Sequence, residues 1–272
     1  MKKVLAGIGV LIVIAIVSFS FNDEKQKELE SADKYSVINV QGRILFTKTG
    51  TDMKRGDVYV TGTDLDFLTK TSRAALASKS KGRFVITGNS KGKVKMLPAV
   101  NNISSRGGAL LNIVDLKQHF SERYLILKRS EVQIGQEAFP MNDEEFFYLV
   151  YDYNGEKIAK KLRNEGSFLI LDRDEIYQVD GKPIPYEEKL MTLYYRKDGK
   201  GLKINDFTPV FPDMIELKEE VDLLLSTFDK ESDDKKIEEV TGYLHEFYGN
   251  PYKDNLNDWL KSEFSLEKTK DE

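Results

Sequence analysis

Few side chains in this sequence could carry out metal or nucleophilic chemistry. The chain of 272 residues has no Cys and only two His residues, His119 and His245. A zinc site would need both imidazoles and a carboxylate, and the separation of the two histidines matches no common ligand spacing. We therefore expect both histidines to be ordinary side chains, and the sequence predicts no metal and no other cofactor.

A Ser-x-x-Lys pattern from Ser78 to Lys81 has the spacing of the nucleophile pair in penicillin-binding enzymes. That chemistry needs both side chains on one helix face. This segment instead lies between two strand-like runs, and it has no Lys-Thr-Gly partner. The sequence predicts a solvated turn here.

Two acidic clusters, Asp143–Glu145 and Asp172–Glu175, could supply the carboxyl pair of a glycosidase, which is held about 5–10 Å apart across a cleft. Asp64-x-Asp66 resembles the start of a calcium loop but does not continue to its Gly and terminal Glu. These patterns favour a protein that is not an enzyme. The alternatives are an envelope enzyme that acts on glycan or peptidoglycan, and a carbohydrate-binding module.

One charge pattern could form a binding surface. Lys91, Lys93 and Lys95 occupy alternate positions, so their side chains would lie on one face of a strand, and Arg83 would extend the basic strip. Lysines of this kind also protect edge strands against aggregation. The functional interpretation is a contact with an acidic partner or an anionic envelope polymer, and these four residues are the candidate partner contacts.

The N-terminal segment indicates the compartment in which the rest of the chain lies. Two lysines precede the apolar run Val4–Phe21, and charges begin at Asp23. A spanning helix needs about 17–25 apolar residues, so we expect a retained membrane anchor over residues 1–21, with a cleaved signal peptide as the alternative. The positive-inside rule then predicts a single-pass inner-membrane protein with its bulk in the periplasm, or an exported protein if the signal is cleaved.

Composition narrows the class of protein further. The formal net charge is -4, which gives no case for binding nucleic acid. Because the chain has no Cys, no disulfide can stabilise it, and hydrophobic burial must do so. Residues 22–34 are highly charged and are predicted to be a spacer between the anchor and the folded part.

Residues 35–100 are predicted to form a small β domain, because short runs alternate apolar and polar residues between turns that contain Gly. The expected core positions are Val40, Ile44, Phe46, Val58, Val60, Leu65, Phe67, Phe84 and Ile86. A polar linker is expected at Asn101–Gly108, with an exposed loop inside one continuous domain as the alternative.

The order of features over residues 37–97 resembles the FecR-type periplasmic domain of bacterial signalling and envelope proteins. The similarity rests on Gly42, Met53-x-x-Gly56-Asp57, Thr61-Gly62 and the run Lys81–Ile86. Such domains are non-catalytic. The resemblance therefore implies a binding or sensing module and supplies no active-site residue.

Residues 109–212 are predicted to form a second antiparallel β region. Its clearest hairpin joins 146–153 to 156–162 through Asn154-Gly155, a pair typical of a type I′ turn. The strand Phe146–Tyr151 is apolar at both parities, which predicts that both of its faces are covered. Pro209 and Pro212 are expected to end the β pattern, because Pro is excluded from central strands.

Apolar residues recur at helical spacing after Pro212. Residues 213–266 are predicted to form two to three amphipathic helices packed on the second β region, and 267–272 a disordered tail. The predicted fold class is mainly β with a C-terminal helical part (α+β). The predicted function is that of a membrane-anchored, outward-facing, non-catalytic envelope protein that binds, assembles or signals with another envelope protein.

Overall fold

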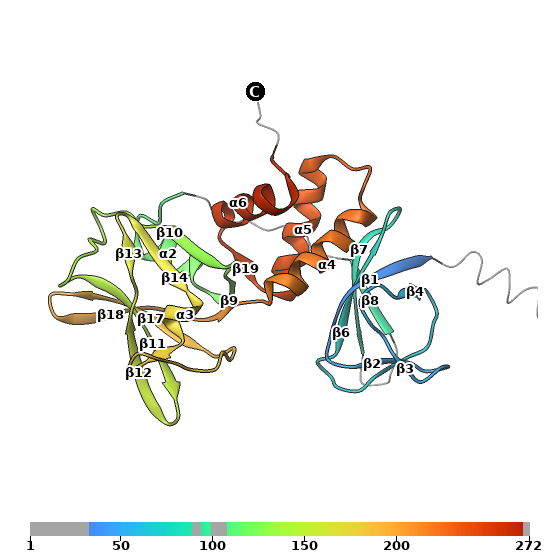
Figure 1. Ribbon diagram of the computed structural model, residues 1–272, viewed down its shortest axis with the longest axis horizontal. Helices are drawn as coiled ribbons and strands as arrows, with labels where there is room; N and C mark the ends of the chain where they lie inside the picture. Colours follow the sequence, from blue (N-terminus) through green and yellow to red (C-terminus); the bar gives the residue numbers. More distant parts are fainter. Residues whose placement is uncertain (1–32, 89–93, 99–107, 269–272) are drawn as a thin grey trace, which may run out of the picture. The chain divides into compact units, whose positions relative to one another are not determined.

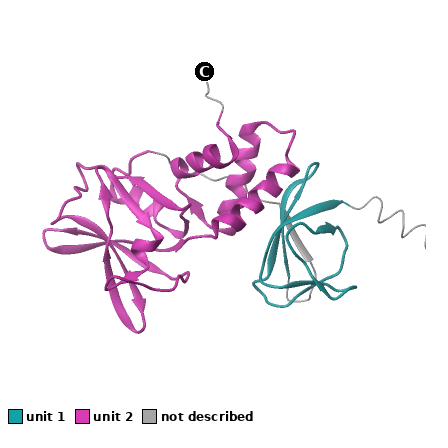
Figure 2. Cartoon of the chain, viewed as in Figure 1, with its two compact units in different colours: residues 1–97 teal, residues 98–272 magenta. Residues whose placement is uncertain are grey.

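The computed structural model describes residues 33–88, 94–98 and 108–268. The chain is mainly β with additional helices, an α+β composition, as the sequence predicts (Figure 1). It divides into two compact units, Met1–Leu97 and Pro98–Glu272 (Figure 2). The expected linker Asn101–Gly108 lies outside the described residues except for Gly108.

Within the described part of the chain, no helix is both long enough and apolar enough to cross a membrane. The expected anchor at residues 1–21 and nearly all of the charged spacer at 22–34 lie outside that part. The membrane anchor therefore stays a prediction from sequence.

Unit 1 contains two small sheets, and the strand pairings described in them are antiparallel. The larger sheet has the order β4 (Val58–Val60), β1 (Lys34–Gln41), β6 (Arg73–Ser78), β7 (Gly82–Gly88) and β8 (Val94–Pro98). The smaller sheet has the order β3 (Thr51–Asp52), β2 (Ile44–Phe46) and β5 (Leu65–Phe67).

The core of unit 1 includes Ile44, Leu65 and Ile86, as expected, but not the valines of β4. Val58 is 57% exposed, whereas Tyr59 is 3% exposed, so the strand face predicted for β4 is wrong. Tyr59 stands opposite Tyr35 of β1, and their ring centroids lie 6.4 Å apart. The larger aromatic ring therefore faces the core, and the β-branched residue beside it faces outward.

Two of the positions behind the FecR resemblance form tight turns. Gly42 follows the end of β1 rather than lying within the strand, and it adopts a φ of 75°. Gly56 has a φ of 86°, and the Asp57 carboxylate accepts a hydrogen bond of 2.8 Å from the backbone N–H of Lys54. These details describe local turns, and the family resemblance stays an expectation.

Unit 2 is built on a six-stranded sheet. Its order is β12 (Glu156–Lys161), β11 (Phe146–Tyr153), β17 (Met191–Lys197), β18 (Lys200–Val210), β9 (Glu122–Leu125) and β19 (Asn250–Pro251). Both neighbours of β9 run parallel to it, so the expectation of an antiparallel region is wrong for this half of the sheet. The hairpin between β11 and β12 turns at Asn154 (φ 51°) and Gly155 (φ 83°), which confirms the predicted turn.

The strand β18 ends at Val210, so the β pattern stops within residues 208–212 as predicted, but Pro209 itself lies inside the strand. The antiparallel pairing with β17 extends only to Phe207, whereas the parallel pairing with β9 continues from Phe207 to Val210. At Pro209 the strand therefore has a neighbour on one side only, so a residue without an N–H leaves no ladder bond unmade.

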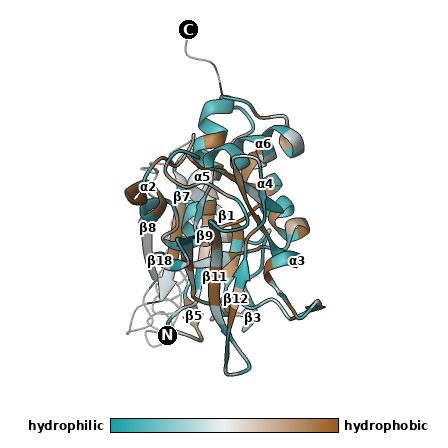
Figure 3. Cartoon of the chain, turned by 90° about the vertical axis from the view of Figure 1, so that its left-hand side faces the viewer, coloured by the Kyte–Doolittle hydropathy of each residue, from teal (hydrophilic) through white to brown (hydrophobic). Residues whose placement is uncertain are grey.

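A second, three-stranded sheet has the order β10 (Arg129–Gln133), β14 (Phe168–Asp172) and β13 (Asn164–Glu165). The remaining small elements are β15 (Gln178–Val179), β16 (Lys182–Pro183), α2 (Ile113–His119) and α3 (Arg173–Ile176). Apolar residues of α2 stand out in brown in Figure 3. One hydrophobic core contains residues of both sheets, among them Phe147, Leu149, Val132 and Leu169.

The core of unit 2 covers only one face of β11. Phe147, Leu149 and Tyr151 are almost fully buried, whereas Phe146, Tyr148 and Val150 on the opposite face are partly exposed. The prediction that both faces of this strand are covered is therefore wrong. This strand therefore contributes aromatic side chains to a partly exposed surface.

Three helices complete unit 2, namely α4 (Met214–Thr227), α5 (Asp233–Phe247) and α6 (Lys253–Phe264). Their apolar stripes are buried, but among the described residues of these helices none belongs to the core of the two sheets. That core includes only Tyr252, just before α6, from this part of the chain. Leu125 and Val210 of the six-stranded sheet are also buried outside that core, so the packing of the helices on the second β region stays a prediction.

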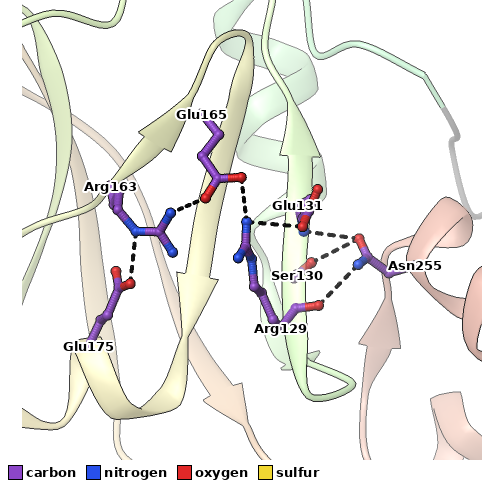
Figure 4. Close-up of polar contacts among 7 residues, drawn as sticks. All are labelled: Arg129, Ser130, Glu131, Arg163, Glu165, Glu175 and Asn255. Atoms are coloured by element: carbon purple, nitrogen blue, oxygen red, sulfur yellow. Dashed lines mark hydrogen bonds and ion pairs between the residues drawn. The ribbon is translucent and has the colours of Figure 1, made fainter.

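Several described contacts that join the helical part to the sheets are polar. The side chain of Asn255 in α6 accepts a hydrogen bond from the backbone N–H of Glu131 (3.2 Å) and donates one to the backbone carbonyl of Arg129 (3.1 Å) (Figure 4). A carboxamide has the donor and acceptor of a peptide group, and it thereby pairs with the edge strand β10 as a neighbouring strand would. Strand β19 adds backbone pairing to β9.

Candidate binding surface

A row of four side chains crosses the partly exposed face of the six-stranded sheet. Tyr148 of β11 lies opposite both Lys161 of β12 and Tyr194 of β17, and Tyr194 lies opposite Lys203 of β18. In the neighbouring row, Arg196 lies opposite Phe146. Directly opposite residues of a sheet have side chains close enough to interact. We call these six residues the aromatic–cationic face.

The aromatic rings of this face pack against one another. The rings of Tyr148 and Tyr194 are stacked, with centroids 5.2 Å apart and planes inclined by 14°, and the ring of Phe146 lies 6.1 Å from that of Tyr148. Gly201 of β18 makes room for this arrangement, because a Cβ at that position would collide with the Tyr148 hydroxyl. The stack therefore depends on a residue without a side chain in the adjacent strand.

The Tyr148 hydroxyl keeps its proton at neutral pH. Burial, and then the neighbouring Tyr194, raise the pKa of Tyr148 above its usual value, while Arg196 opposes them. A protonated phenol can donate a hydrogen bond as well as accept one. The ring stack thus presents a donor beside the cations.

Two cations lie against the ring of Phe146. Lys161 Nζ is 4.5 Å from the ring centroid, and Arg196 Cζ is 5.7 Å from it, both within the range of cation–π attraction. Lys161 has a 3.4 Å ion pair with Asp143, whose side chain is fully exposed. Among the described residues Arg196 has no ion pair, so no carboxylate in this part of the chain neutralises its charge.

Lys203, at the other end of the row, has a shorter ion pair than Lys161. Its Nζ lies 2.7 Å from Asp206, and the hydrogen bonds from Lys203 and then Thr192 hold the pKa of Asp206 below its usual value. The unbalanced positive charge of the face is therefore concentrated near Phe146, where Lys161 and Arg196 meet.

The residues predicted from sequence as partner contacts do not form this face. Lys91 and Lys93 lie outside the described residues, and only the backbone of Lys95 is described, in β8. Arg83 is 4% exposed, so its inclusion in an exposed basic strip is wrong. Ala77, opposite Arg83 in β6, is also fully buried, because this face of the sheet is covered rather than open to solvent.

His119 has a structural environment. Its Nε2 is 2.8 Å from the hydroxyl of Tyr124, and its ring meets those of Phe120 and Tyr252 edge to face at 4.8 and 5.2 Å. Burial lowers the pKa of His119 to about 4, so the ring is neutral near pH 7. His245 lies in α5, far along the chain from this cluster.

The carboxylates on the three-stranded sheet form ion pairs. Glu165 bridges Arg163 and Arg129, and Arg163 also donates a 2.8 Å hydrogen bond to Glu175 (Figure 4). Hydrogen bonds from Arg163 and then Arg129 lower the pKa of Glu165. A carboxylate held in its ionised form cannot supply the general acid that a glycosidase needs. This cluster therefore gives no support to the hydrolase alternative.

Asp172, Arg173 and Asp174 line a cavity of about 390 Å³ together with the start of α4. Asp172 and Asp213 each accept hydrogen bonds from backbone N–H groups of the first turn of a helix, α3 and α4 respectively. Their position is explained by helix capping. No group of three or more Asp, Glu or His side chains in the described ranges could hold a metal ion.

Comparison of the chain with protein-family models, with curated proteins and with solved structures finds no match in any of the three. The aromatic–cationic face therefore has to be interpreted from its own chemistry. The sequence pattern that could have predicted this face is the run Phe146–Tyr151, which is apolar at both parities. That pattern is equally compatible with a strand covered on both faces and with an exposed aromatic surface.

Proposed function

We propose that this chain is a membrane-tethered, non-catalytic protein of the cell envelope that binds another protein through the aromatic–cationic face of unit 2. The observation that carries the proposal is three partly exposed rings together with Arg196, which has no ion pair among the described residues. Tyr, Phe and Arg are the residue types enriched at protein interfaces and at their energetic centres.

The geometry of the rings favours a protein over a carbohydrate or single-stranded nucleic acid as the partner. Sugars and bases stack on ring faces that are free and accessible. Here Tyr148 and Tyr194 stack on each other, so one face of each ring is already occupied. The ring of Phe146 is contacted by two cations. What the surface presents is ring edges, a hydroxyl donor and positive charge.

Photo-crosslinking in intact host cells tests the protein-binding role. We expect a photoreactive phenylalanine at position 194 to give one discrete adduct heavier than the chain, because this position lies at the centre of the face. The matched control is the same residue at position 168, an aromatic on β14 that is 38% exposed, and it should give no such adduct. Equal adducts at both positions, or none at 194, would contradict the proposal.

The membrane tether is tested separately. If Val4–Phe21 is retained as a spanning helix, the native protein should stay in the membrane pellet after a carbonate wash at high pH and keep its N-terminal sequence. The expected result follows because only a spanning or deeply inserted segment resists that wash. A soluble mature form that begins near Phe21 would show that the segment is a cleaved signal instead.

A further inference from the structure

We infer that the aromatic–cationic face recognises an acidic peptide segment, with one carboxylate of that segment held between Lys161 and Arg196 beside the ring of Phe146. This inference rests on the proposed protein-binding function and specifies the chemistry of the partner. It is carried by the position of the two cations, by the aromatic surroundings and by the incomplete neutralisation of their charge within unit 2.

The two cations are placed by the sheet itself. Arg196 is the direct cross-strand neighbour of Phe146, and Lys161 is the cross-strand neighbour of Tyr148, one row away. Both side chains lean over the same ring, with Nζ and Cζ at 4.5 and 5.7 Å from its centroid. Holding two like charges at one ring is unfavourable, and an anion placed between them would relieve that repulsion.

The charge balance of the face selects an anion. Among the described residues, the counter-charge of Lys161 is Asp143, which is fully exposed, and an ion pair between exposed groups contributes little to stability. Arg196 can present its planar fork of N–H donors to both oxygens of a carboxylate, and such charge-assisted pairs are shorter and stronger than neutral hydrogen bonds. A carboxylate therefore complements this position.

The surroundings favour a peptide as the source of that carboxylate. Tyr148 and Tyr194 extend the face beyond the cations as a rigid, stacked pair whose edges can pack on apolar side chains. Lys203, paired with Asp206, ends the row. An extended segment that places an acidic side chain at Arg196 and an apolar one over the tyrosines would contact both parts.

The test measures binding of the full-length chain, in mild detergent, to poly-L-glutamate. We expect Arg196→Gln and Lys161→Gln each to weaken binding at least tenfold and to reduce its salt dependence, because each removes one charge from the proposed contact. Lys157→Gln is the matched control. Lys157 lies on the same strand and the same face as Lys161, pairs with Asp152 and should lose less than twofold.

Three results would overturn the inference. One is an equal loss for Lys157→Gln and Arg196→Gln, which would show diffuse attraction. Another is binding of polygalacturonate or single-stranded DNA that depends on Arg196 when poly-L-glutamate does not bind. The third is no binding of poly-L-glutamate while position 194 still gives its crosslinked adduct; this result leaves the protein-binding function standing. Absence of the adduct removes the function and the inference together.

A second set of variants separates the ring stack from the charges. Gly201→Ala should weaken binding because its Cβ displaces the Tyr148 ring, while Arg196 and Lys161 are unchanged. Circular dichroism and thermal unfolding show whether this variant folds. Tyr194→Ser serves as the second route if it does not. Unchanged affinity in a folded Tyr194→Ser variant would contradict the role given to the tyrosines.

Discussion

Replacing Gly249 with alanine should lower the free energy of unfolding of this protein by about 3 kcal/mol or more. Gly249 follows α5 with a φ of 111°, a conformation that a residue with a Cβ rarely adopts. A Cβ built at this position would also lie 2.6 Å from the backbone carbonyl carbon of Arg123 in β9. Because that neighbour is backbone, it cannot move aside as a flexible side chain would.

The position explains why the effect should be large. Gly249 donates its N–H to the carbonyls of Leu244 and His245 at 3.1 Å and so closes the end of α5. The next two residues form β19, which pairs with Tyr124 and Leu125 of β9. Moving Gly249 away from β9 would separate the helical part from the sheet at the place where the backbone joins them.

Gly155→Ala is the matched control for this prediction. Gly155 also has a positive φ, 83°, but an added Cβ would meet nothing within 4 Å. It should therefore show only the conformational cost of about 1–2 kcal/mol. Urea unfolding followed by far-UV circular dichroism measures both variants. Equal losses for Gly155→Ala and Gly249→Ala would mean that the close approach to Arg123 contributes nothing.

The second large effect is a loss of stability in acid that depends on His119. The pKa of His119 is about 4 in the folded protein, against 6.5 for an exposed imidazole, and the cause is burial. The unfolded chain therefore binds a proton below pH 6.5 that the folded chain does not bind until about pH 4. Stability from this group is complete above pH 6.5 and is lost progressively as the pH falls to about 4.

The size of this effect follows from the pKa difference. Each pKa unit corresponds to 1.36 kcal/mol, so the full loss is roughly 3 kcal/mol. His119 is the last residue of α2, where the helix dipole favours a positive charge, but that attraction contributes only about 0.3–1 kcal/mol and does not outweigh burial. The neighbouring rings of Phe120, Tyr124 and Tyr252 offer no counter-charge.

Comparison of the wild-type chain with His119→Gln isolates this term. For each protein, the free energy of unfolding from urea titration is compared with its own value at pH 7.5. Between pH 6.5 and 4 this free energy should fall further in the wild type than in the variant. Carboxylates titrate in the same range and contribute equally to both proteins. Parallel stability curves, or an NMR titration of His119 with a midpoint near 6.5, would contradict the prediction.

Local patterns in the sequence determined much of the secondary structure. Asn154-Gly155 predicted its hairpin, because few residues adopt two successive positive φ angles. The apolar spacing after Pro212 predicted two to three helices, and the structure has α4, α5 and α6 there. These features depend on interactions between residues near one another in the chain, and such interactions leave a readable pattern.

The tertiary structure alone decided which faces are buried and which are exposed. Alternation in β4 and β11 shows that a strand has two faces. Which face is covered depends on distant strands, so Tyr59 rather than Val58 is buried, and Phe146 and Tyr148 are partly exposed. Pro209 is tolerated because β17 has already ended beside it. Asn250 pairs with Tyr124, which is far away in the sequence, and no local pattern in either segment predicts this pairing. The aromatic–cationic face exists because the hydrogen-bond register of four strands brings Lys161, Tyr148, Tyr194 and Lys203 into one row.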